Sequence, residues 1–336
     1  MKMKTHKNLF EKVCSYKSLY GAYLKARKGK TNLPEVLKFT YNLEDELSNL
    51  QNELQNQIYK PGEYRHFVIF EPKERRISAL PFRDRVIHHA ICSVIEPIFE
   101  KKFVYDSYAC RKEKGTHAGV NRIQKFIKEV NNNYYVLKCD VLKYFSSVNH
   151  EILKKIIRKK IADKKLLWLL DQIIDSAEAG IPIGNLTSQL FANIYLNELD
   201  EFIKYELRIK YYIRYMDDFI ILHESKQYLH KIKQDVKLFF VSMRLTLHPK
   251  KSNIFPITLG IDFLGYRIFN NHRLIRKSTT KRFIRNTKTK LKKYDSGVIN
   301  FDKLMESFNS WEAYMSHGNS HNLKNSLYQG YFKNVM

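Results

Sequence analysis

Glycine, proline and cysteine are all scarce in this chain of 336 residues, which has 12 Gly, 8 Pro and 4 Cys. The low glycine and proline contents exclude a collagen-like protein, long linkers and glycine-rich repeats. The cysteines are far apart and form no CxxC pair; they are Cys14, Cys92, Cys110 and Cys139. This spacing disfavours a zinc knuckle and disulfides, and it predicts reduced thiols in a cytoplasmic protein.

Long apolar runs are also missing. No stretch approaches the roughly 20 residues that span a bilayer. The lysine-rich start, residues 1–7, is not followed by the apolar segment of a signal peptide. We therefore expect neither a membrane partner nor export. The chain is nevertheless rich in core-forming residues, because 44% are hydrophobic and 22 Tyr and 21 Phe are among them, which rules out disorder as the overall state.

Acidic residues are outnumbered, since 34 Asp and Glu face 59 Lys and Arg, a formal net charge of +25. Such an excess on a folded chain predicts a polyanionic partner, most often nucleic acid, with solubility alone as the alternative. The excess is strongest in residues 273–293, where ten of 21 residues are Lys or Arg and none is acidic. This change of composition predicts a subdomain boundary near residue 270.

Hydrophobic periodicity predicts an α+β protein. Apolar positions three and four residues apart predict helices in residues 8–60, 84–99, 149–175, 186–203, 226–243 and in the tail after 273. Asn149 is a predicted N-cap, and either Thr187 or Ser188 is predicted to cap the helix that follows. Short aromatic and aliphatic runs predict strands at 66–70, 77–80, 134–141, 211–215, 219–222, 261–266 and 267–269. The first two strands form a predicted hairpin with the basic turn 72–76 at its tip.

Three aspartates interrupt or end these apolar strands. Asp140 follows the apolar run 134–139, and Asp217 and Asp218 separate two further runs. Aspartate is also common in exposed turns. A carboxylate at the end of a core strand, however, is costly to desolvate unless a cation neutralises it. Two such carboxylates on neighbouring strands would repel each other, and Mg²⁺ removes that conflict.

Two Mg²⁺ ions about 3.5–4 Å apart can activate a 3′-hydroxyl and stabilise a leaving pyrophosphate. Acids of this kind in a strongly basic protein therefore predict a nucleotidyl-transfer enzyme. The acids would hold metal ions, and the surrounding basic surface would hold a polynucleotide.

The segment Tyr215-Met216-Asp217-Asp218 resembles the YxDD signature of reverse transcriptases, and six further blocks occur in that family's order. They are residues 73–81, 107–111, 140–145, 180–189, 247–251 and 263–266. The resemblance covers about residues 65–336 and implies a right-hand polymerase with fingers, an antiparallel palm sheet and a helical thumb. It divides the chain into an N-terminal helical extension (1–60), interleaved fingers and palm (61–270) and a basic helical thumb (271–336).

The resemblance also implies roles for single residues. It makes Asp140, Asp217 and Asp218 catalytic, and these three together with Val141 the binding positions for two Mg²⁺ ions, with Mn²⁺ as a substitute. The implied nucleotide contacts are Arg76, Arg111, Phe145, Ile183, Gln189 and Lys251, and the implied nucleic-acid contacts are Lys277, Lys281, Arg282, Arg285 and Lys288. Phe145 would be a steric gate that selects dNTPs, and Lys251 a proton donor to the leaving pyrophosphate. The alternatives are a core aromatic for Phe145, a surface cation for Arg111, and a solvated basic helix for the thumb cations.

One block departs from the common family pattern. Most reverse transcriptases carry Pro-Gln-Gly where this chain has Pro182-Ile183-Gly184. Isoleucine supplies no hydrogen bond to an incoming nucleotide, so discrimination between bases is expected to relax. The pattern Ile-Gly-x-x-x-Ser-Gln and the stretch 311–323 resemble the reverse transcriptases of diversity-generating retroelements, which copy a template RNA with frequent errors opposite adenine.

The resemblance implies several partners. They are a structured template RNA, the RNA/DNA hybrid, dNTPs and an oligomer of a small basic accessory variability protein. Two alternatives stay open at this point. One is an antiphage-defence reverse transcriptase that uses a dedicated noncoding RNA. The other is a polymerase-shaped RNA-binding scaffold without activity, against which the three aspartates argue.

Overall fold

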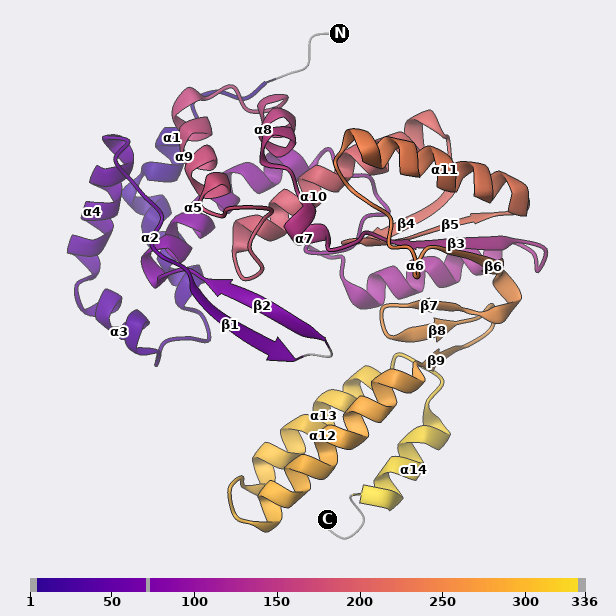
Figure 1. The fold of residues 1–336 in the computed structure, drawn as a ribbon. Coiled ribbons are helices and arrows are strands. Elements are labelled where there is room, and N and C mark those ends of the chain that lie inside the picture. The colour runs from indigo at the N-terminus through magenta and orange to yellow at the C-terminus, as the bar shows by residue number, and fades with distance from the viewer. Residues whose placement is uncertain (1–4, 71–72, 332–336) are drawn as a thin grey trace. The chain divides into compact units, whose positions relative to one another are not determined.

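The computed structural model describes residues 5–70 and 73–331 (Figure 1). The contacts within the chain divide it into two compact units. The first comprises Met1–Arg111, Cys139–Phe219 and Lys231–Ser252, and the second comprises Lys112–Lys138, Ile220–His230 and Asn253–Met336. This partition follows contacts between residues, so the functional division at residues 60 and 270 stays a prediction. Residues 1–4 and 332–336 of the predicted extension and thumb, and Pro72 of the predicted turn, lie outside the described residues.

The N-terminal part of the first unit is helical, as predicted. Its helices are α1 (Phe10–Cys14), α2 (Tyr16–Arg27), α3 (Pro34–Tyr41), α4 (Leu43–Gln55) and α5 (Phe82–Glu100). The leucines of α4 that recur at three- and four-residue spacing, Leu47, Leu50 and Leu54, are fully buried. The apolar stripe therefore forms because it removes these side chains from water.

The predicted hairpin is confirmed and consists of β1 (Arg65–Phe70) and β2 (Glu74–Ala79), paired antiparallel. A loop of the same unit supports it, since the Ser78 amide donates to the Ile183 carbonyl at 2.9 Å. Gly184, with φ 129°, follows directly, and a Cβ there would lie 2.6 Å from the Ser78 carbonyl oxygen. Only glycine fits this close approach of two backbones.

Four strands form one sheet in the order β4-β5-β3-β6. They are β3 (Tyr135–Asp140), β4 (Tyr211–Tyr215), β5 (Asp218–His223) and β6 (Asn253–Pro256). The strand predictions for the first three are confirmed, whereas β6, which pairs antiparallel with β3, was not predicted. Its sequence, Asn-Ile-Phe-Pro, is too short and mixed to show a clear alternation.

The helix predicted over residues 149–175 is wrong in its length, because it consists of α8 (His150–Arg158) and α9 (Lys164–Asp175). Asp163 starts the second helix: one carboxylate oxygen accepts from the Leu166 amide at 3.1 Å, and the other accepts from the amides of Leu9 and Phe10 at 2.7 and 2.9 Å. A side chain with these partners stabilises a new helix start. The predicted N-cap Asn149 is confirmed by its 3.1 Å bond from the Ile152 amide.

The next helix, α10 (Leu186–Glu201), lies within the predicted range 186–203 and continues as a π-helical turn, η1 (Phe202–Glu206). Thr187 and Ser188 are wrong as caps, because both lie inside the helix and are buried. The N-cap position is Asn185, whose side chain donates instead to the Tyr64 hydroxyl at 2.8 Å. The chain also forms α7 (Tyr144–Ser147) and α11 (Lys226–Ser242).

The second unit contains α6 (Thr116–Glu129), which was not predicted, and the helical tail, which was. The remaining elements are η2 (Ile257–Leu259), β7 (Ile261–Phe263), β8 (Tyr266–Ile268), β9 (Arg273–Ile275), α12 (Lys277–Asp295), α13 (Phe301–Met315) and α14 (His321–Tyr331). The three strands form a sheet in the order β7-β8-β9. Helices α12 and α13 run side by side (Figure 1) and are joined by the stacked rings of Phe283 and Trp311, 4.3 Å between centroids. No helix in the described part of the chain has the length and apolar character needed to cross a bilayer.

Candidate active site

The connection between β4 and β5 is a two-residue turn made of Met216 and Asp217. Met216 has φ 54°, in the left-handed region, which costs a non-glycine residue about 1–2 kcal/mol. Its carbonyl oxygen accepts a 3.0 Å hydrogen bond from Nη1 of Arg214. The turn is therefore held in a strained backbone conformation by a side chain of the preceding strand.

Asp140 lies at the end of β3, next to this turn. Backbone bonds fix the arrangement: the Val141 amide donates to the Asp217 carbonyl at 3.2 Å, and the His248 amide donates to the Asp140 carbonyl at 2.7 Å. The neighbouring β3 residues Leu137 and Cys139 are fully buried, whereas the Asp140 side chain keeps 19% of its surface exposed. The sheet thus brings Asp140 and Asp217 together although they are far apart in the sequence.

The two carboxylates influence each other's ionisation. The pKa of Asp217 is raised, chiefly because the group is buried and also because Asp140 is near; Lys251 and Arg75 act in the opposite direction. Lys251 Nζ lies 2.7 Å from each of the two carboxylate oxygens of Asp140. The site therefore concentrates negative charge that needs a positive partner, and a lysine supplies one at Asp140.

Asp218 begins β5, and its charge acts on a different neighbour. Together with burial, which is the largest cause, Asp218 and Asp140 raise the pKa of the Cys139 thiol to about 12. In residues 5–70 and 73–331, no group of three or more His, Cys, Asp or Glu side chains is arranged to hold a metal ion.

The pair formed by Asp140 and Asp217 nevertheless suits Mg²⁺. This ion prefers oxygen ligands, and proteins commonly bind it through one or two carboxylates together with water and substrate phosphates. Burial and, to a lesser degree, the nearby Asp140 raise the pKa of Asp217, and a divalent cation would favour the charged carboxylates that both effects disfavour. The residues present therefore fit the metal, while the predicted participation of Asp218 and Val141 stays a prediction.

The predicted steric gate, Phe145, belongs to the short helix α7 and is half-buried. Its carbonyl accepts from the Ile181 amide at 2.8 Å. Gly180, with φ 66°, packs so closely that a Cβ there would lie 2.3 Å from the same carbonyl oxygen. The neighbouring ring of Tyr144 is buried and its hydroxyl donates to the Ala192 carbonyl at 2.6 Å. The backbone of Phe145 is thus anchored by the loop that also contains Ile183.

The other predicted nucleotide contacts lie in different settings. Ile183 is half-buried, and Arg76 and Gln189 are exposed on β2 and α10. Arg111 has a side chain only 6% exposed, with Nε donating to Glu100 at 2.8 Å and Nη1 donating to the carbonyls of Val104 and Ser107. The structure therefore gives Arg111 partners within the fold.

The predicted nucleic-acid contacts all lie on α12. Lys277, Lys281, Arg285 and Lys288 are exposed, and Arg282 is half-buried. The exposed four recur every three or four residues, opposite the buried Phe283 and Thr287, and so form one face of the helix. None of the five forms an ion pair within the part of the chain that the structure describes.

Sequence reasoning missed several residues around the turn. Arg75 was passed over in favour of Arg76, yet Arg75 is the one that lowers the pKa of Asp217. Arg214, Asp200 and Asn193 were assigned to apolar elements, although they are buried at 0%, 0% and 1% exposure, and the guanidinium of Arg214 donates hydrogen bonds to the other two side chains. A signal was present, since a charge at the centre of an apolar strand or helix needs a buried partner.

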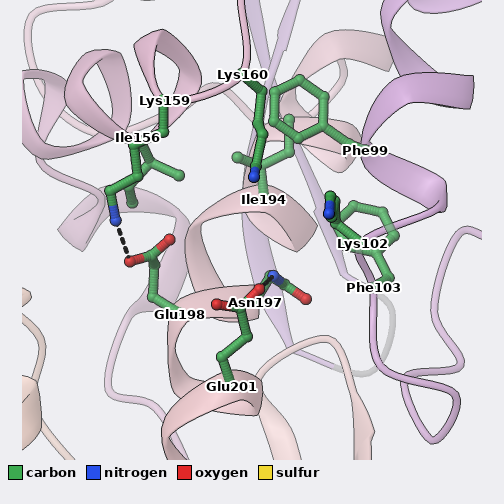
Figure 2. Close-up of a pocket in the computed structure, with 10 residues that line it drawn as sticks. All are labelled: Phe99, Lys102, Phe103, Ile156, Lys159, Lys160, Ile194, Asn197, Glu198 and Glu201. Carbon is green, nitrogen blue, oxygen red and sulfur yellow. Dashed lines mark hydrogen bonds and ion pairs between the residues drawn. The ribbon is translucent and has the colours of Figure 1, made fainter. Parts of the chain in front are cut away.

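A separate cavity of about 140 Å³ lies on a neighbouring face of α10 (Figure 2). Its lining includes Asn197, Glu198 and Glu201 of α10 and the rings of Phe99 and Phe103. Lys159 donates to Glu198 at 2.6 Å across its edge. None of the three aspartates lines this cavity, so it is not part of the site described above.

Comparisons with known proteins agree with this arrangement. Residues 58–268 match the sequence model of the family described as reverse transcriptase (RNA-dependent DNA polymerase). Protein YkfC of Escherichia coli K12 is 27% identical over 281 residues, covering 69% of this chain and 72% of YkfC. The group II intron-encoded protein LtrA of Lactococcus lactis subsp. cremoris is 23% identical over 316 residues, covering 71% of this chain and 51% of LtrA.

Among solved structures, the apo telomerase from Candida tropicalis is similar with a TM-score of 0.50 and 13% identity. The match covers 67% of this chain and 50% of that one. At this identity the likeness concerns the fold alone. This chain therefore spans about half the length of LtrA and of the telomerase chain.

Proposed function

The chain belongs to the reverse transcriptase family, and from that premise we propose that it is an RNA-directed DNA polymerase that copies a structured RNA into cDNA. The observation that carries the proposal is the pairing of Asp140 with Asp217. Strand order and the bond from the Val141 amide to the Asp217 carbonyl bring the two residues together, and Asp140 is near enough to contribute to the raised pKa of Asp217. A scaffold that only bound RNA would gain nothing from keeping two repelling acids at one site.

In the proposed reaction, Asp140 and Asp217 hold Mg²⁺, with Asp218 and Val141 as further predicted positions. When bound, the metal ions would lower the pKa of the primer 3′-hydroxyl and neutralise the charge of the leaving pyrophosphate. Lys251 already contacts Asp140, and we assign it to the same end of the site, where its ammonium can donate a proton to pyrophosphate. Arg75, whose charge reaches Asp217, is a candidate contact for the triphosphate beside the predicted Arg76.

Substrate choice is proposed to depend on the loop that Gly180 and Gly184 shape. Phe145, anchored to this loop, would contact the sugar and exclude a 2′-hydroxyl. Ile183, whose carbonyl supports the hairpin, would lie against the base pair without offering a hydrogen bond. Gln189 stays a predicted nucleotide contact.

The exposed cationic face of α12 supports the proposed thumb. Lys277, Lys281, Arg285 and Lys288 would follow the phosphates of a template–primer hybrid, with Arg282 at the edge of that face. Contacts of this kind carry no base information. The choice of template must then come from the structure of the RNA or from a partner, for which a small basic accessory protein is the candidate.

We further propose the diversity-generating subtype, on the basis of Ile183 and the sequence around it. The similarity to LtrA favours a second candidate, a reverse transcriptase of the group II intron-encoded kind. The antiphage-defence alternative shares the same chemistry. Fidelity separates the first from the others, because only the first requires frequent errors opposite adenine.

A primer-extension assay with an RNA template, dNTPs and Mg²⁺ tests the polymerase. We expect extension by the unaltered chain and none by Asp217→Asn, while Asp45→Asn, an exposed acid on α4, extends normally. Failure of the unaltered chain to extend any primed RNA would overturn the proposal.

Sequencing the cDNA tests the subtype. We expect errors concentrated opposite template adenines, and a several-fold decrease of these errors in Ile183→Gln. Ile183→Val, which changes the volume and adds no hydrogen bond, is the control and should keep the error spectrum. A low and even error rate in the unaltered chain would refute the diversity-generating assignment and leave the polymerase intact.

A further inference from the structure

Arg214 is a fully buried charge in the middle of an apolar strand. It has 0% exposure, and its neighbours Tyr212 and Ile213 are equally buried. A guanidinium in such surroundings is strongly destabilising unless ion pairing and hydrogen bonds replace water. Its presence in β4 therefore demands an explanation beyond packing.

The charge is neutralised by Asp200 of α10, itself at 0% exposure. Nε donates to one carboxylate oxygen at 2.7 Å and Nη2 donates to the other at 2.6 Å, which is the two-pronged geometry that arginine and carboxylate prefer. Asp200 also accepts from the Tyr212 hydroxyl at 2.5 Å. This pairing fixes the plane of the guanidinium.

The other three N–H groups of the guanidinium also have acceptors. Nη2 donates to Ser107 Oγ at 3.1 Å, and Nη1 donates to Asn193 Oδ1 at 3.3 Å and to the Met216 carbonyl at 3.0 Å. All five donors are thus used. Four of them hold the group against fixed parts of the fold, and the fifth reaches the peptide that joins Met216 to Asp217.

The backbone of Arg214 is fixed from its other side. Its amide donates to the Asp106 carbonyl at 2.9 Å, and its carbonyl accepts from the Tyr108 amide at 2.9 Å. The side chain therefore extends from a strand that is hydrogen-bonded along both edges, so its base cannot shift easily. A carbonyl bonded to it has little freedom to rotate.

Resting on the proposed function, we propose that Arg214 is a positioning residue for the metal-binding carboxylate of Asp217. By holding the Met216 carbonyl, it keeps Met216 at φ 54° and fixes the peptide plane from which the Asp217 side chain extends. Release of this bond would let the turn relax and move the carboxylate away from Asp140. Lysine cannot replace it, because an ammonium on a flexible stem cannot span Asp200, Ser107 and the turn at once.

The experiment compares Arg214→Lys with two controls of the same unit. Tyr212→Phe removes a buried bond to the same Asp200 and keeps the bond to Met216. Asn197→Ala alters another face of α10 and touches neither Arg214 nor the turn. Thermal melting first selects a temperature at which all chains are folded. The readouts are then kcat and KM for a dNTP, and Mn²⁺ binding followed by electron paramagnetic resonance without substrate.

We expect Arg214→Lys to lower kcat by about 10- to 100-fold and to weaken Mn²⁺ binding by roughly 5-fold or more, with KM changed less than about 3-fold. Both controls should stay within about 3-fold of the unaltered chain in every readout. Equal kcat and equal Mn²⁺ affinity in Arg214→Lys and Tyr212→Phe would overturn the inference and leave a structural ion pair.

A substitute variant and a measurement on the unaltered chain distinguish failure of this inference from failure to fold and from failure of the proposed function. If Arg214→Lys does not fold, Ser107→Ala takes its place, because it loosens the guanidinium and leaves the pair with Asp200 intact. It should lower kcat and Mn²⁺ affinity where Tyr212→Phe does not, and equality of these two variants would again overturn the inference. Absence of primer extension by the unaltered chain would refute the polymerase function instead, independently of Arg214.

Discussion

The β4–β5 turn and the helix α12 handle positive charge in opposite ways. At the turn, Arg214 is buried at 0% exposure and all five of its donors have acceptors within the fold. Along α12, the cations Lys277, Lys281 and Arg285 are exposed and form no ion pair within the described ranges 5–70 and 73–331. The charge of Arg214 is therefore neutralised within the fold, whereas the charges of α12 are exposed and can contact an anionic partner.

The difference reflects what each region is proposed to do. A reaction at one phosphorus atom requires carboxylates fixed to a fraction of an ångström, and only buried, fully bonded groups hold them that well. A nucleic-acid backbone presents many equivalent phosphates, so a cationic face needs charge density and little geometric exactness. Changes at the turn should therefore act on catalysis, and changes on α12 should act on binding.

Loss of a carboxylate that we propose to be catalytic is expected to give the largest effect. Asp140→Asn should lower kcat by at least about 1,000-fold, because one charge of the proposed metal-binding pair disappears. Hybrid binding, measured by fluorescence anisotropy, should stay within about 3-fold, as should both readouts in the control Asp45→Asn. Normal primer extension by Asp140→Asn would contradict the proposal that Asp140 binds a metal ion. An equal loss of hybrid binding would contradict the idea that the turn acts on catalysis and α12 on binding.

Neutralising the face of α12 should give the converse result. The triple change Lys281→Gln, Arg285→Gln and Lys288→Gln should weaken hybrid binding by about 10- to 100-fold and lower the slope of log Kd against log salt by about 2–3. The kcat at saturating hybrid should stay within about 3-fold.

A matched control removes the same amount of charge elsewhere. Lys155, Lys164 and Lys165, all exposed on α8 and α9, are changed to Gln together. Equal weakening of binding by the two triple variants would show that α12 contributes only net charge.

The predicted steric gate, Phe145, allows a test of substrate selection within the site itself. Phe145→Ala should increase the use of rNTPs relative to dNTPs by about 10-fold or more, because the ring no longer excludes a 2′-hydroxyl. Phe145→Tyr keeps the ring and should keep the selectivity. Competition assays with paired rNTP and dNTP measure this selectivity in both variants. An unchanged ratio of rNTP to dNTP use in Phe145→Ala would show that Phe145 is a core aromatic and not a steric gate.

The smallest expected effect concerns stability. Because the folded-state pKa of Asp217 is raised, the native state holds that proton more tightly than the unfolded chain. The associated stability is fully present below the unfolded pKa and is lost as the pH rises through the folded pKa. In EDTA at neutral pH, Asp217→Asn should therefore raise the melting temperature, on the order of 1–3 °C, and the gain should vanish in acid.

The same measurement on α12 completes the comparison. The triple variant of α12 should melt within about 1 °C of the unaltered chain, because exposed charges contribute little to folding. A melting temperature of Asp217→Asn below that of the unaltered chain would contradict the idea that the turn stores an electrostatic conflict.

Much of the fold follows from local sequence. The leucines of α4 and the apolar runs around Asp217 predicted their elements correctly, because burial of a periodic face dominates such segments. The break between α8 and α9 was missed, since Asp163 starts a helix with partners more than 150 residues away, at Leu9 and Phe10. Strand β6 was missed for a similar reason, as it exists through its pairing with β3.

The candidate site shows the same division. The unusual setting of Asp140 and Asp217 was predictable, because a carboxylate at the end of an apolar strand is costly to desolvate wherever it lies. Arg75 was not predictable over Arg76, because the choice depends on which face of β2 meets the turn. The sequence also left two interpretations of Arg111, a nucleotide contact or a surface cation. Only the folded structure shows that it is hydrogen-bonded to Glu100 and to two backbone carbonyls.

The sequence alone determined that acids end two apolar strands in a strongly basic chain, since composition and periodicity are properties of the chain itself. Only the tertiary structure decided that Lys251 contacts Asp140, that Asp217 lies beside it, and that Arg214 holds the turn. The physical reason is that ion pairs and hydrogen bonds between distant segments depend on directions and distances of a few ångströms. Those are fixed by how the sheet and α10 pack, which no local pattern specifies.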